Sequence, residues 1–70
     1  MKEITASMAG MVLNVLVNAG EDIAAGQVVI VLESMKMEIP VESSVSGKVA
    51  EVKASIGDFV NEGDVLITVE

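Results

Sequence analysis

Apolar residues occur along this 70-residue chain in short runs that are separated by glycine-containing turns. Valine, isoleucine and threonine dominate the runs, and β-branched residues favour strands over helices. Six glycines interrupt the chain too often for helices of ordinary length. The pattern therefore predicts an all-β domain. We expect its strands at residues 4–6, 11–17, around 23, 28–32, 41–43, 48–54, 59–60 and 65–69.

The two halves of the chain carry the same pattern at a fixed offset of 37 residues. Every glycine takes part: Gly10, Gly20 and Gly26 correspond to Gly47, Gly57 and Gly63. Two such copies, roughly residues 1–33 and 38–70, predict a single domain, residues 1–70, that closes about a pseudo-two-fold axis into a flattened barrel or sandwich. In both copies two valines stand three residues apart, which breaks strict alternation and predicts a β-bulge or a change of sheet.

Between the two copies lies the stretch Glu33–Glu38, with Lys36 flanked by Met35 and Met37. The strand-like runs around it predict a hairpin whose tip holds Lys36 in solvent, opposite the two chain ends. Strand alternation predicts that the two methionines share one face and Lys36 takes the other. On this basis Lys36 is either a solvated turn residue above methionines that cover the barrel end, or a chemical handle. Phe59, the one aromatic residue, is expected in the core.

The amino-acid composition excludes several classes of function. The chain has no Cys, His, Trp, Tyr or Arg, so it lacks disulfides, a histidine base and the usual zinc ligands, and we expect neither a metal site nor catalytic residues. The formal net charge of −7 disfavours nucleic acid as a partner. The apolar runs are far shorter than a bilayer requires, and the opening residues do not resemble a signal peptide. We expect a cytoplasmic monomer that does not contact a membrane.

Glu33-Ser34-Met35-Lys36-Met37 resembles the attachment signature of biotinyl domains, the carrier parts of biotin-dependent carboxylases. The likeness extends over the chain: residues 6–10 are similar to the family's opening Ala-Pro-Met-x-Gly, and residues 47–49 and 57–64 to its second half. It implies a barrel-sandwich hybrid of two four-stranded antiparallel sheets with quasi-two-fold symmetry. The ungapped repeat leaves no room for the thumb loop of some carrier subunits. Ser34 replaces the usual Ala, and Ser7 and Ser44 stand where the family often has Pro.

The resemblance implies that Lys36 is biotinylated by a biotin protein ligase. The biotinyl arm would then carry carboxyl groups between biotin carboxylase and carboxyltransferase components. Met35 and Met37 would be flanking recognition residues, unless they only cover the barrel end. The short free-standing biotin/lipoyl attachment proteins of bacteria are the nearest likeness, although a domain trimmed from a longer chain fits equally. Lipoate, alone or together with biotin, is the alternative cargo, and an unmodified β domain that binds other proteins is the third hypothesis.

Overall fold

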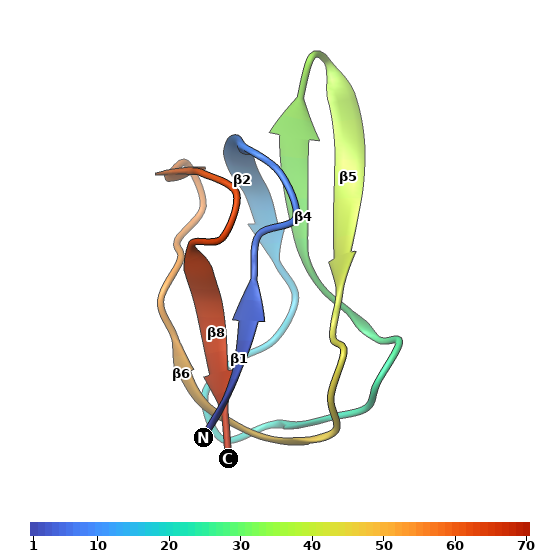
Figure 1. Cartoon of the computed structure of the whole chain (residues 1–70), viewed down its shortest axis with the longest axis vertical. Coiled ribbons are helices and arrows are strands. Elements are labelled where there is room, and N and C mark those ends of the chain that lie inside the picture. Colours follow the sequence, from blue (N-terminus) through green and yellow to red (C-terminus); the bar gives the residue numbers. More distant parts are fainter.

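The computed structural model describes residues 1–70 and consists of two antiparallel four-stranded sheets (Figure 1). One sheet has the strand order β1-β8-β6-β3, and the other, which we call the attachment sheet, has the order β5-β4-β2-β7. No helix of membrane-spanning length and apolarity is present. The strands are β1 (Lys2–Thr5), β2 (Gly10–Val15), β3 (Asp22–Ile23), β4 (Val28–Ser34), β5 (Met37–Glu42), β6 (Gly47–Val52), β7 (Phe59–Val60) and β8 (Val65–Val69).

The internal repeat is visible in the strand pairing. β2 pairs with β4 in the first half just as β6 pairs with β8 in the second, and each pair has its register shift at the same place. The shifts fall between Val12 and Asn14 and between Val49 and Glu51, so the bulge that the valine spacing predicted is confirmed in both copies. Each bulge lets the strand turn its apolar side chains toward the core on both sides of the irregularity.

Four turns are closed by the same kind of hydrogen bond, which was not predicted from the sequence. In each turn a side-chain oxygen accepts a hydrogen bond from the backbone N–H three residues earlier, which satisfies a donor that no strand partner reaches. The acceptors and donors are Glu21 with Asn18, Gln27 with Ala24, Asp58 with Ser55, and Asp64 with Asn61. The glycines of these turns have φ near 90°, a conformation in which a side chain is strained.

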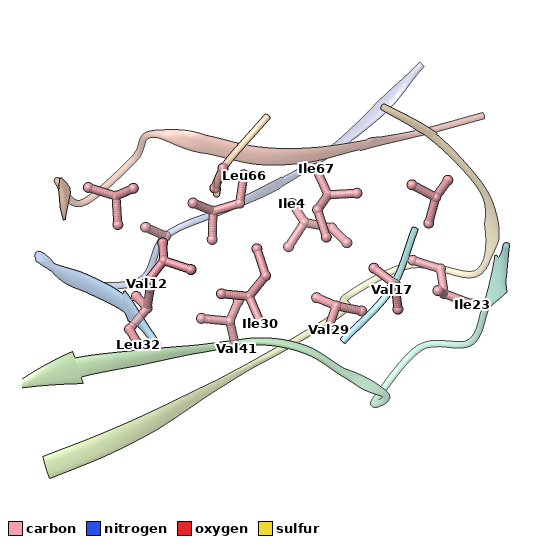
Figure 2. Close-up of a cluster of buried hydrophobic side chains, with 14 of the residues drawn as sticks. Ile4, Val12, Val17, Ile23, Val29, Ile30, Leu32, Val41, Leu66 and Ile67 are labelled. Atoms are coloured by element: carbon pink, nitrogen blue, oxygen red, sulfur yellow. The ribbon is translucent and has the colours of Figure 1, made fainter. Parts of the chain in front are cut away.

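The core lies between the two sheets and is entirely aliphatic (Figure 2). Both sheets contribute: Ile30 and Leu32 on β4 pack toward Leu66 and Ile67 on β8, and all four are fully buried. The predicted strand at residues 28–32 is apolar on both faces, and in the structure Val29, Ile30 and Leu32 are buried. Fully burying a side chain of this size stabilises the fold by about 1.5–3 kcal/mol, so this layer is the main source of stability.

Two expectations from the sequence are wrong. Phe59 is not a core residue, because β7 turns Val60 inward and leaves the Phe59 side chain 69% exposed. The strand expected at residues 41–43 is longer and begins at Met37. Pro40 lies inside this strand. Proline has no backbone N–H to donate, and it is tolerated here because β5 is an edge strand of its sheet.

Candidate attachment site

The β4–β5 hairpin carries the candidate site at its tip. Ser34 and Met37 are the last Cα partners of the two strands, so Met35 and Lys36 alone form the loop. Both loop residues have positive φ, 54° for Met35 and 65° for Lys36. A two-residue hairpin loop with positive φ at both positions is a type I′ turn, whose twist matches that of the flanking strands. Lys36 is thus placed at the tip by a tight and specific turn.

This turn changes the expected placement of the methionines. Strand alternation does not continue through residues 35–37, because Met35 and Lys36 are loop residues and only Met37 belongs to a strand. The Met35 side chain is 93% exposed and that of Met37 is 64% exposed. The interpretation that these methionines cover the barrel end is therefore wrong, since neither contributes to the core.

The tip projects beyond the rest of the molecule. Pairing between β2 and β4 ends at Met11 and Glu33, so Ser34 and Met37 have each other as partners and no neighbour from β2. The last row that crosses the whole attachment sheet is formed by paired residues of four strands. In the order β7, β2, β4, β5 these are Phe59, Met11, Glu33 and Glu38. Lys36 stands only one residue pair and a turn above this row. The turn between β4 and β5 lies at the end of the molecule opposite both termini (Figure 1).

Lys36 is exposed, and none of the side-chain hydrogen bonds of the structure involves it. Lys2, in contrast, donates through Nζ to the Ser46 carbonyl oxygen at 2.6 Å. Lys48 is exposed within β6, and Lys53 follows the end of that strand. The structure thus presents one lysine amine on a projecting turn. An enzyme that modifies this amine can approach it without moving any other part of the chain.

The exposed row beneath the tip was not predicted from the sequence. Met11 and Phe59 are Cα partners on the outer face of the attachment sheet, and both side chains are exposed. Their neighbours Val12 and Val60 point inward and are buried. A short strand of two residues, such as β7, gives too little alternation for its inward side to be read from the strand itself.

Comparisons with known proteins agree with this description. The family model described as "Biotin-requiring enzyme" matches residues 2–69. The chain is 56% identical over 64 residues to the biotin/lipoyl attachment protein of Bacillus subtilis, covering 91% of this chain and 88% of that protein. It is 42% identical over 64 residues to the biotin carboxyl carrier protein of Streptococcus mutans, covering 91% of this chain and 49% of the relative. The urea carboxylase of Kluyveromyces lactis superposes with a TM-score of 0.90 at 29% identity, over 99% of this chain and 6% of that one.

The fold and the site thus define a small carrier domain that presents one lysine on a hairpin. The chain belongs to the biotin/lipoyl attachment family, as the match over residues 2–69 shows. Within that family it is a biotin carrier domain of the kind found in biotin-dependent carboxylases. The fold expected from the resemblance is confirmed, with two four-stranded antiparallel sheets related by quasi-two-fold symmetry.

Proposed function

We propose that Lys36 is the residue to which biotin is attached, and that the loaded domain serves a biotin-dependent carboxylase. The observation that carries the proposal is the position of the lysine: its amine stands on the projecting type I′ turn, exposed and without a hydrogen-bond partner. A biotin protein ligase is the partner that attachment requires. Biotin carboxylase and carboxyltransferase components are the partners that carriage of a carboxyl group requires.

The exposed Lys36 amine is a suitable nucleophile for the covalent attachment of biotin. The Lys36 amine attacks the activated carboxyl carbon of biotinyl-AMP. A C–N amide bond forms, the C–O bond to AMP breaks, and the two displaced protons pass to bases of the ligase or to water. The amide removes one positive charge, which takes the formal net charge from −7 to −8. Because the chain has no histidine or cysteine to assist, the ligase must supply the base.

The rest of the domain positions the arm. Biotin, when attached, supplies the atom that holds and releases a carboxyl group. The hairpin keeps the base of the arm at one end of the molecule (Figure 1). The exposed lysine side chain extends the reach of the arm into solvent. Tethering raises the effective concentration of the cargo at two separate active sites, which a diffusing cofactor cannot match. Met35 and Met37, exposed on either side of Lys36, are the side chains that a ligase or a carboxylase meets first.

Intact-mass measurement tests the proposal directly. The wild-type protein is incubated with biotin, ATP and a biotin protein ligase, next to Lys36→Arg and the matched control Lys48→Arg. We expect one biotinyl increment on the wild type and on the Lys48 variant, and none on the Lys36 variant. Absence of the increment on the wild type, with a ligase that modifies another carrier in the same mixture, would refute the proposal.

Lipoate remains a second candidate cargo, because the relative with 56% identity is named a biotin/lipoyl attachment protein. The same assay with lipoate and a lipoate ligase decides this: a lipoyl increment that disappears in Lys36→Arg makes Lys36 a dual acceptor.

A cytoplasmic location and a monomeric state are part of the same proposal. Cell fractionation followed by streptavidin blotting tests the location, and sedimentation of the purified protein tests the monomer.

A further inference from the structure

Three large apolar side chains are exposed next to the attachment site. Met11 is the second residue of β2, with 39% of its surface exposed. Phe59 pairs with it from β7, and Ile56 lies in the loop before β7. The loop is held against β2 by two backbone hydrogen bonds, from Gly57 N–H to the Val12 oxygen and from Val12 N–H to the Asp58 oxygen. We call Met11, Ile56 and Phe59 the apolar edge. In a domain this small, an exposed apolar cluster marks a contact surface when the fold does not need it.

The internal repeat shows that the fold does not need it. At the equivalent places of the other copy the chain has Lys48 for Met11, Asp22 for Phe59 and Ala19 for Ile56. Lys48 and Asp22 are Cα partners just as Met11 and Phe59 are, so the same backbone accepts a pair of charges. The apolar edge therefore has no apolar counterpart in the other copy, and the requirements of strand pairing do not explain it.

Negative charge continues the same row. Glu33 is the Cα partner of Met11 on the other side of β2, and Glu38 is the partner of Glu33. The outer face thus offers two apolar side chains followed by two carboxylates within one row of the sheet. The complementary surface is an apolar recess beside basic side chains, on a protein that approaches the hairpin from this face.

We propose that the apolar edge, together with Glu33 and Glu38, is the surface on which the biotin protein ligase docks; this inference rests on the proposed function of Lys36. The row lies about 7 Å below the tip along the sheet, and spans about 10 Å from β4 to β7. The ligase must hold the unmodified amine itself within bonding distance, so its body has to contact the domain here.

The internal repeat suggests the variants for the test, because the residue pair of one copy can be replaced by the equivalent pair of the other copy. Met11→Lys with Phe59→Asp gives the attachment sheet the pair found in the opposite copy. Lys48→Met with Asp22→Phe makes the reverse change on the other sheet and is the matched control. A third protein, with Met11→Ser and Phe59→Ser, removes the apolar surface without adding charge. Thermal melts establish that each variant is folded, and initial rates of biotinylation give kcat and KM.

We expect kcat/KM of the ligase to fall about tenfold in both variants of the apolar edge, mainly through KM, as for loss of a central contact. The control variant is expected to keep the wild-type value, and all proteins should reach full biotinylation at long times. Equal kcat/KM in folded wild type, Met11→Ser/Phe59→Ser and the control would overturn the docking surface while leaving Lys36 as the attachment residue. If the wild type gains no biotin at all, the proposed function and the docking surface fail together.

Discussion

Glu33 on β4 and Glu38 on β5 are Cα partners, so two carboxylates face each other at the base of the hairpin that carries Lys36. Both side chains are exposed, and neither accepts a hydrogen bond within the structure. Like charges directly opposite each other in an antiparallel pair are destabilising. The facing carboxylates therefore lower the stability of the domain, but they would attract a basic surface of a partner that approaches Lys36.

Replacing one of the two carboxylates by an amine should stabilise the domain. We expect Glu38→Lys to raise the free energy of unfolding by about 0.5 kcal/mol, because repulsion becomes attraction across the pair. For a domain of this size that corresponds to a rise of about 2–4 °C in Tm. The measurement is a thermal melt at low salt and at high salt, where screening should reduce the gain.

Glu42→Lys is the control for that prediction. It makes the same change in net charge on the same strand, but the Cα partner of Glu42 is the apolar Val28. An equal rise in Tm for both variants would mean that the gain comes from the lower net charge and not from the facing carboxylates.

The type I′ turn is expected to be strained by its residues. Met35 and Lys36 both have left-handed backbone conformations that Asn and Gly adopt more readily. Met35→Asn should therefore raise the free energy of unfolding by about 0.5–1 kcal/mol, since Met35 is so exposed that no packing is lost. Urea denaturation measures the change, with Met37→Asn as the control.

Met37 lies in a strand and is not among the residues with positive φ, so asparagine there should give no gain or a small loss. A loss of stability in Met35→Asn would show that the turn is held by something other than the preference of residue 35. Biotinylation rates of the same variant then report whether the ligase reads the Met35 side chain or only the shape of the turn.

The features that were predicted correctly from the sequence are those that occur in both copies of the repeat. The glycine offset and the paired valine spacing predicted two equivalent halves, each with an irregularity in its long strand, because turn geometry and core packing impose the same demands on each copy. Lys36 was singled out for the opposite reason: it lies in the joint between the copies and has no counterpart.

The features that were missed occur where the two copies differ. Phe59 corresponds to Asp22, and both point outward, but hydrophobicity alone assigned the aromatic residue to the core. Had the prediction followed the repeat instead, the charged Asp22 would have placed Phe59 on the surface. The two-residue loop was missed because neither Met35 nor Lys36 is a residue that ordinarily indicates positive φ.

Gly10 is required by a close approach and not by backbone conformation. Its φ is not positive, but a Cβ atom there would come within 2.7 Å of the Glu33 carbonyl oxygen at the base of the hairpin. Gly47 has the same relation to Glu70, at 2.6 Å. We expect Gly10→Ala to lower the free energy of unfolding by about 1–3 kcal/mol, as for overpacking against a rigid neighbour. Urea denaturation measures this loss.

The matched control is Gly26→Ala, where a Cβ would meet nothing within 4 Å but φ is +89°. It should lose about 1 kcal/mol through backbone strain alone. The two variants differ further in their local effect: only Gly10→Ala pushes on β4, so only it should shift the backbone amide signals of Glu33 and Ser34 in an NMR spectrum. If those signals stay in place and stability is unchanged, β2 and β4 do not approach as closely as described, and the hairpin is not held from this side.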